Sequence, residues 1–281
     1  MAIPILKNWQ DYFVNRDEGL GSSYERIILN RKLLQICELF QVKTVLEAPC
    51  FGFTGLSGIN SLALAKNGIA VQIMDNDRAR LELVEAVWKE VGLPVKAHYS
   101  QDFSTRLFPP DSFDLTWNFS ALWFIAEPEE FLAEICRITR KAVFLCVPNR
   151  TGLGYLSQKF FGRKELKADL REENIDPFRI KRIMKNLNWT LLKSDYIDCP
   201  PWPDIGMPKE KFLKKIGLRW LLPKKIEPSS RTILDYYSGK NPEFEKTMLK
   251  HAWFEQKAPG LIKKFWAHHR FFLFIPPKNE K

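Results

Sequence analysis

VLEAPCFGFTGLSGINSLALAKNG, residues 45–68, decides the fold of this chain. An apolar, β-branched run over 42–48 ends in a loop that carries Gly52, Gly55 and Gly58, and an amphipathic segment follows over 59–68. This order predicts a strand, a glycine-rich turn and a helix. Such a unit opens a parallel sheet and places a ligand beyond the carboxyl end of its first strand.

Short apolar runs and amphipathic segments continue to alternate after this unit. The pattern predicts strands over 69–75, 95–100, 112–119, 141–148, 189–197 and 270–277, and helices over 78–92, 128–140 and 177–188. Strands that alternate with helices pair in parallel, with helices on both faces of the sheet. The sequence therefore predicts an α/β, Rossmann-like fold with a mostly parallel, seven-stranded sheet.

Four segments are expected along the chain. Residues 1–41 form a helical preface or lid, with an amphipathic helix over 24–40, and residues 42–199 form the core. Residues 200–269 form a basic, aromatic helical insertion with helices near 209–222 and 242–267, which serves as a substrate cap or a surface contact. Residues 270–281 supply the last strand and a tail.

The charge of the chain is distributed unevenly. Residues 1–150 carry 16 Lys and Arg against 18 Asp and Glu, whereas residues 151–281 carry 27 against 15. This asymmetry indicates either an anionic partner of the second half or a well-solvated basic surface. No apolar stretch approaches the roughly 18 to 20 residues of a membrane-spanning helix, and the first residues lack the layout of a secretory signal.

Cysteine and histidine spacing predicts no metal site. The five cysteines are scattered without a CxxC pair, which favours a reducing, cytoplasmic location. If His268 and His269 open a strand, their side chains point to opposite faces, and they are expected to be a poor pair of ligands.

Acidic residues follow the second and third predicted strands. Asp75 lies about 20 residues after the glycine loop, where a carboxylate can accept hydrogen bonds from both hydroxyls of a ribose. Asp77 suits the N-cap of the helix that starts near Arg78. After the third strand, Asp102 can accept from an exocyclic amino group, and Phe103 can lie against a purine.

In this order the motifs resemble class I S-adenosylmethionine (SAM) dependent methyltransferases of the type 11 group. The resemblance rests on Glu47, the glycine loop, Asp75, the Asp102–Phe103 pair and the PDSFDL run over 110–115, and it covers about residues 40–150. It implies an enzyme that uses SAM and releases S-adenosylhomocysteine. The family usually has glycines where this chain has Pro49 and Phe51, so the path of the loop is open.

The resemblance assigns cofactor contacts position by position. Glu47 would orient the loop and the amino group of SAM, the loop glycines would hold the methionine part, and Asn118 would border the site of methyl transfer. The full expected set is Glu47, Ala48, Gly52, Thr54, Gly55, Gly58, Asp75, Asn76, Asp102, Phe103 and Asn118.

The acceptor is expected to be a small or lipid-like molecule, with Tyr24, Trp123 and Asn149 as candidate contacts. Tyr24 and Trp123 suit structural packing equally well, His251 is a weak candidate base, and no catalytic residue is assigned. Residues 209–222 have the pattern of a basic amphipathic helix, which fits either a cap over the pocket or peripheral contact with an anionic membrane. RNA binding is permitted but not favoured.

Two other functions compete with methyl transfer. Pro49 and Phe51 make a non-catalytic binding protein of the same fold plausible. Tyr155 and Lys159 fit the Tyr-x-x-x-Lys pair of a short-chain NAD(P) dehydrogenase, although the Asn-Asn-Ala-Gly run of that family is absent.

Overall fold

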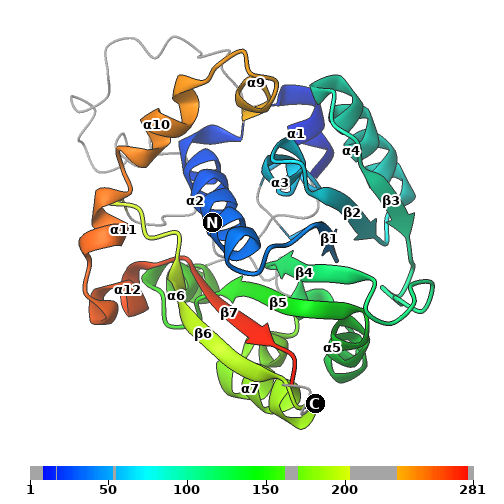
Figure 1. The fold of residues 1–281 in the computed structure, drawn as a ribbon. Helices are drawn as coiled ribbons and strands as arrows, with labels where there is room; N and C mark the ends of the chain where they lie inside the picture. Colours follow the sequence, from blue (N-terminus) through cyan, green and yellow to red (C-terminus); the bar gives the residue numbers. More distant parts are fainter. Residues whose placement is uncertain (1–8, 17, 53–54, 162–169, 203–232, 278–281) are drawn as a thin grey trace, which may run out of the picture.

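The computed structural model describes residues 9–16, 18–52, 55–161, 170–202 and 233–277. Seven strands form one sheet of order β3-β2-β1-β4-β5-β7-β6 (Figure 1). The strands are β1 (Thr44–Glu47), β2 (Ala70–Asp75), β3 (Lys96–Tyr99), β4 (Phe113–Phe119), β5 (Thr139–Pro148), β6 (Thr190–Ile197) and β7 (His269–Ile275). The predicted fold class is confirmed, because only β7 runs antiparallel to its neighbours.

The direction of β7 decides which residues meet at the functional edge of the sheet. His269, its first residue, pairs in register with Pro148 at the end of β5 and with Ile197 at the end of β6. The start of β7 therefore lies at the same edge as the carboxyl ends of the parallel strands, where α/β sheets bind ligands.

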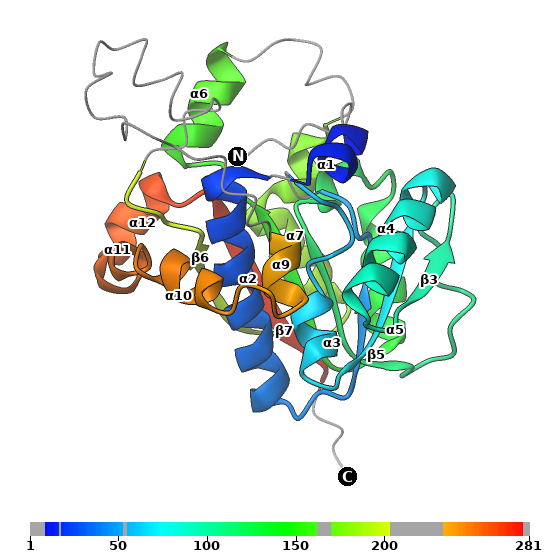
Figure 2. The same cartoon turned by 90° about the horizontal axis from the view of Figure 1, so that it is seen from above.

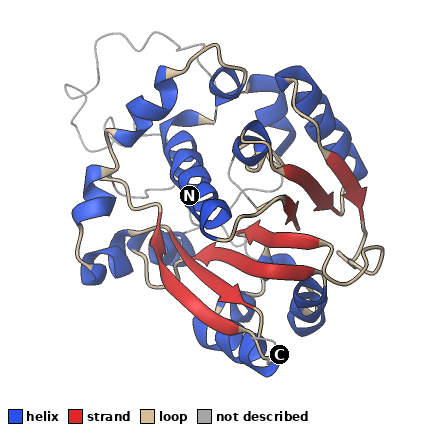
Figure 3. Ribbon diagram, viewed as in Figure 1, coloured by secondary structure: helices blue, strands red, loops and turns tan. Residues whose placement is uncertain are grey.

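Helices cover both faces of the sheet (Figure 3). In Figure 1, α1 (Trp9–Asn15), α2 (Gly19–Leu39), α3 (Leu62–Lys66), α4 (Arg78–Val91) and α9 (Ile233–Tyr237) lie on one side of the sheet, and α5 (Pro128–Arg137) and α7 (Pro177–Asn186) lie on the other. The remaining helices are α6 (Leu153–Phe161), α10 (Glu243–Leu249), α11 (Trp253–Lys257) and α12 (Gly260–Trp266), with 3-10 turns η1 (Leu122–Phe124) and η3 (Glu172–Ile175). Figure 2 shows the same layers from above.

Each face of the sheet has its own hydrophobic core. On β1, Val45 belongs to the cluster that includes Val84 of α4, whereas the next residue, Leu46, belongs to the cluster that includes Leu132 of α5 and Ile183 of α7. Successive side chains of a strand point to opposite faces, so an apolar run such as Val45–Leu46 requires cover on both sides.

The ends of α4 follow from its sequence. The Asp77 carboxylate accepts a hydrogen bond from the backbone N–H of Arg80 at 3.1 Å, which confirms the predicted cap. At the other end Gly92 adopts a left-handed conformation with φ +78°, as a glycine after the last helical turn commonly does.

The second half of the chain contains the helical region predicted near 242–267 and one further helix. The predicted region consists of three short helices, α10, α11 and α12. Pro259 precedes α12 with an extended ψ of 150° and has no N–H to donate, so a helix cannot continue through it. The helix α6 was not predicted.

The helix expected over 209–222 lies outside the described residues. Within the described part of the chain, no helix combines the length and the apolar character that crossing a bilayer requires.

Gly52 offers a test of how tightly the loop after β1 packs. An added Cβ would lie 2.3 Å from the backbone oxygen of Phe119, at a φ of +108°. We expect Gly52→Ala to lower the free energy of unfolding by about 3 kcal/mol or more, since overpacking adds to the penalty of a positive φ. Urea denaturation measures this loss.

Gly92→Ala is the matched control. Gly92 has a φ of +78° but has no atom within 4 Å of the added Cβ, so the loss should be only about 1 to 2 kcal/mol. Equal losses in the two variants would contradict a tight contact between the loop and β4.

Candidate functional site

The loop after β1 is hydrogen-bonded to both strands that flank β1. The backbone N–H of Ala48 donates to Trp117 O of β4 at 2.9 Å, and that of Cys50 donates to Met74 O of β2 at 2.9 Å. The loop therefore crosses the carboxyl edge of the sheet between β2 and β4, which is the place where an α/β sheet of this kind binds ligands.

The loop glycines make packing contacts. Gly52 lies against the backbone of Phe119 and Ser120, and Gly58, with φ +70°, lies against Val84 of α4, only 2.7 Å from an added Cβ. Gly55 also has a positive φ. These glycines let the loop approach β4 and α4 closely, whereas their expected contact with a cofactor stays a prediction. Thr54 lies outside the described residues.

Phe51 occupies the place of a glycine in the family pattern, and its ring forms part of an aromatic wall. The ring centroid lies 5.5 Å from that of Phe103 and 5.4 Å from that of Phe124. The guanidinium of Arg80 lies 4.9 Å from the centroid of the Phe51 ring. The altered loop thus contributes an apolar surface instead of bare backbone.

This wall borders a cavity of about 700 Å³ beyond the carboxyl ends of β2 and β3. Its volume lies within the range of small-molecule sites. Its lining consists of Phe51, Asn76, Asp77, Arg78, Ala79, Arg80, Tyr99, Phe103 and Phe124. Two residues expected to contact the cofactor, Asn76 and Phe103, are thereby brought together.

Asp102 does not belong to this lining. Its exposed carboxylate accepts hydrogen bonds from the Ser104 N–H at 3.0 Å and from the Ser100 hydroxyl at 3.1 Å. These bonds, the Ser104 N–H first, lower the pKa of Asp102. Its carboxylate therefore shapes the turn after β3.

Asp75, the expected ribose contact, is fully buried and already paired (side-chain exposure 0%). Arg80 donates from Nε to Oδ2 at 2.8 Å and from its terminal nitrogen to Oδ1 at 2.5 Å. The Asp77 N–H and the Cys50 thiol also donate to this carboxylate. A ribose hydroxyl must therefore compete with Arg80 for Asp75.

Sequence reasoning overlooked Arg80, although the sequence carries a signal for it. Arg78 and Arg80 stand in the first turn of α4, where the helix dipole disfavours a cation. A basic residue in that position needs a compensating contact, which is Asp75 for Arg80 and the ring of Tyr99 for Arg78.

Glu47, at the end of β1, is buried in a polar pocket. Its carboxylate accepts from Asn60 Nδ2 at 3.1 Å and from Ser61 Oγ at 2.6 Å. Burial raises the pKa of Glu47 to about 7, although both hydrogen bonds favour the charged form. A carboxylate with this pKa changes its charge near neutral pH, so it can respond to a cationic group placed beside it.

Arg26 of α2 ties the preface to the same loop. Its fully buried guanidinium donates to both carboxylate oxygens of Glu18, to Leu56 O at 3.0 Å and to Asn60 Oδ1. Since Asn60 also holds Glu47, α2 and the end of β1 share one hydrogen-bonded network.

The expected acceptor contacts lie apart from the cavity. Tyr24 donates its hydroxyl to Glu255 at 3.0 Å. Trp123 is fully buried and donates to Ser120 O, whereas Asn149 donates to the backbone of Lys264 and Ala267. These three side chains make structural contacts, and their roles as acceptor contacts stay predictions.

Asn118 and His251 also lie outside the cavity lining. Asn118 is buried and donates to Ala48 O at 3.3 Å, which joins β4 to the loop. The imidazole of His251 packs edge-on against Trp202, with ring centroids 5.0 Å apart.

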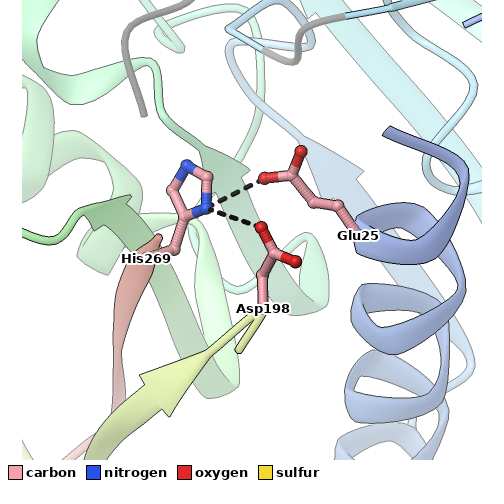
Figure 4. Close-up of side chains that lie close together, drawn as sticks. All are labelled: Glu25, Asp198 and His269. Carbon is pink, nitrogen blue, oxygen red and sulfur yellow. Dashed lines mark ion pairs between the residues drawn. The ribbon is translucent and has the colours of Figure 1, made fainter. Parts of the chain in front are cut away.

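A second group of polar side chains lies at the start of β7. Glu25 of α2, Asp198 and His269 are all buried, with 1–2% side-chain exposure, and their side chains converge (Figure 4). The neighbouring His268 contacts Asp198 with Nδ1 at 2.6 Å. Both histidines therefore reach the same carboxylate. Only His269 belongs to β7, so the expectation of opposite faces, which required both to open the strand, does not apply.

Glu47 predicts a pH dependence of stability. A raised pKa means that the folded protein holds a proton that the unfolded chain has released, so stability should fall as the pH rises from about 4.5 to about 7. The contribution is on the order of 3 kcal/mol. Urea denaturation across this range should show a smaller fall for Glu47→Gln.

Glu82→Gln, which replaces an exposed carboxylate of α4, is the control and should keep the slope of the unaltered protein. Identical slopes in the Glu47→Gln variant and the unaltered protein would contradict the raised pKa.

The methyltransferase domain family has a model that matches residues 53–147 of this chain. A putative methyltransferase from Bacillus halodurans C-125 has a similar structure, with a TM-score of 0.51 and 13% identity over 89% of this chain and 99% of that chain. Phosphoethanolamine N-methyltransferase 2 of Haemonchus contortus, in complex with phosphomonomethylethanolamine and S-adenosylhomocysteine, also has a similar structure. Its TM-score is 0.51, with 17% identity over 88% of this chain and 53% of that chain. The [4+2]-cyclase SpnF has a TM-score of 0.52 and 13% identity over 88% of this chain and 80% of that chain.

No curated protein sequence matches the chain. The solved structures share its fold, and the presence of a cyclase among them shows that this fold hosts more than one reaction. The position of β7 argues against the dehydrogenase alternative. An antiparallel strand lies between β5 and β6, whereas dinucleotide-binding sheets have the order 3-2-1-4-5-6.

Proposed function

We propose that this chain is an enzyme that transfers a methyl group from SAM to a small-molecule or lipid-like acceptor, since the model of a methyltransferase domain matches residues 53–147. The observation that carries the proposal is the cavity of about 700 Å³ at the carboxyl ends of β2 and β3. It lies beside the loop after β1, in the position where such sheets bind nucleotide-like ligands.

The residues at this edge fit the adenosine part of SAM on one condition. Phe51, Phe103 and Tyr99 offer apolar faces for a purine, and Asn76 offers polar atoms at the end of β2. Asp75 can serve the ribose only when Arg80 moves away from it, because Arg80 now engages both carboxylate oxygens. Arg80 already lines the cavity, so its side chain has space into which it can turn.

The methionine part of SAM would lie toward Glu47 and the loop over 52–58. The charged carboxylate of Glu47 would attract its ammonium group, and Asn60 and Ser61 fix the direction of that carboxylate. Bound SAM supplies a methyl group on a sulfonium, which is a good leaving group. The chain's own contribution is then to orient the acceptor for in-line attack, which alone contributes on the order of 7 to 11 kcal/mol in favourable cases.

The acceptor class is supported by two proteins of similar structure. The Haemonchus contortus enzyme binds phosphomonomethylethanolamine, and a putative sarcosine dimethylglycine methyltransferase from Galdieria sulphuraria shares the fold at 14% identity. Small amine acceptors are therefore the first class to screen. A role of residues 209–222 as a cap over the pocket, or in peripheral contact with an anionic membrane, and a cytoplasmic location complete the proposal.

A non-catalytic binding protein is the second candidate, and the Asp75–Arg80 ion pair favours it. A carboxylate that is already saturated with hydrogen bonds offers little to a ribose. The two candidates make different predictions for the removal of Arg80.

Arg80→Met tests whether Asp75 binds the cofactor. With Arg80 removed, Asp75 is free to accept from the ribose, so SAM and S-adenosylhomocysteine should bind about tenfold more tightly than to the unaltered protein. Adding Asp75→Asn to this variant should abolish the gain, which isolates the interaction. Calorimetric titration measures both effects, and NADP is titrated in parallel.

Arg179→Met provides the control, because Arg179 also makes a bidentate pair, with Glu129, but lies on α7 outside the cavity lining. The affinity of the Arg179→Met variant for SAM should equal that of the unaltered protein. If neither the unaltered protein nor Arg80→Met binds SAM, methyl transfer is excluded and the binding-protein candidate remains. Binding of NADP in place of SAM would contradict both.

A further inference from the structure

Three side chains from distant parts of the chain meet beyond the ends of β4, β5 and β6. Glu25 comes from α2, Asp198 follows β6, and His269 opens β7 (Figure 4). We propose that Glu25, Asp198 and His269 bind a divalent transition-metal ion.

The geometry of the three donor atoms suits a single ion. His269 Nδ1 lies 2.9 Å from Glu25 Oε1 and 3.8 Å from Asp198 Oδ2, and all three donor atoms lie within 4.8 Å of one another. Donors bound to one ion at about 2.0–2.2 Å are separated by about 3–3.6 Å. Side-chain shifts of about an ångström therefore complete the site.

These atoms lack the hydrogen bonds that buried polar groups normally make. Within the described residues, Glu25 Oε1 and His269 Nδ1 have no hydrogen-bond partner, so their 2.9 Å approach is a contact without hydrogen-bond geometry. Asp198 Oδ1 is also without a partner there. Because more than nine in ten buried polar groups are paired, the convergence of these atoms points to a ligand between them.

The charges of the Glu25, Asp198 and His269 side chains also favour a divalent metal ion. Glu25 and Asp198 are two buried carboxylates; His269 faces both of them, and His268 contacts Asp198. Isolated charges in a protein interior must be paired or bind a metal. A divalent ion balances both carboxylates and takes the lone pair of a neutral His269. Protons on His269 and His268 are the competing occupants, His269 beside Glu25 and His268 beside Asp198.

The donor set indicates the class of metal. One imidazole nitrogen and two carboxylate oxygens suit Zn²⁺ or Mn²⁺, whereas sites with oxygen donors alone favour Ca²⁺ and Mg²⁺. His268 Nδ1, 2.6 Å from Asp198 Oδ2, would orient this ligand as outer residues do at metal sites. Three protein ligands leave at least one coordination position open, as at catalytic zinc sites.

The site adjoins the end of β4, where the acceptor is expected. The imidazole of His269 packs against the ring of Phe119, with centroids 4.5 Å apart, and the next residue is Ser120. An open position there suits an acceptor that carries an oxygen donor. This use of the metal rests on the proposed methyl transfer, whereas metal binding itself does not.

Metal content of the full chain tests the proposal. Protein stripped with a chelator and then dialysed against Zn²⁺ should retain one equivalent, measured by mass spectrometry of the metal. Glu25→Gln and His269→Gln should each retain less than a tenth of that. His98→Gln, a half-buried histidine on β3 outside the cluster, is the matched control and should retain the full equivalent.

Two results would overturn the proposal, namely no retained metal in the unaltered protein and equal retention in the two cluster variants. If the variants do not fold, pulsed EPR of the unaltered protein loaded with Mn²⁺ tests the site instead. It should detect one imidazole nitrogen coordinated to the metal. The absence of a coordinated nitrogen would contradict the site. These readouts involve no SAM, so a failed metal site is distinguishable from a failed methyltransferase.

Discussion

The buried guanidinium of Arg26 is the contact on which the arrangement of the site depends. It joins Glu18 to the backbone of Leu56 and to Asn60, and Asn60 passes the connection on to Glu47 at the end of β1. Breaking a buried ion pair by removing one partner costs about 3–5 kcal/mol, because the other charge remains without solvent. The preface is thus joined to the loop after β1 at Leu56 and Asn60.

Much of the fold could be predicted from local pattern. The alternation of apolar and amphipathic segments predicts the strands, and Asp77 and Gly92 predict the ends of α4. The parts that could not be predicted depend on distant contacts. The role of Arg80 as the partner of Asp75 is evident only once Asp75 is known to be buried. The cluster of Glu25, Asp198 and His269 joins residues that are far apart in the chain. No spacing rule connects them.

The two ends of the functional edge differ in their buried ion pairs. At β2, the carboxylate of Asp75 accepts hydrogen bonds from Arg80, Asp77 and Cys50, so its charge is balanced beside the cavity. At β7, the carboxylates of Glu25 and Asp198 lie beside two imidazoles, those of His268 and His269. The proposed cofactor would displace Arg80 from Asp75 at the first end, whereas the proposed metal ion would lie between the acids at the second end.

The place of β7 in the sheet also affects how the chain is made. β6 contacts the sheet through β7, which follows it by about 70 residues and lies between it and β5. Chains emerge from the ribosome from their N-terminus, and domains begin to fold as they emerge. The five strands from β3 to β5 can pair early, but β6 must wait with an unpaired edge until residues 269–275 arrive. Throughout that interval the exposed edges of β5 and β6 are open to other chains, so nascent protein needs protection until its last strand closes the sheet.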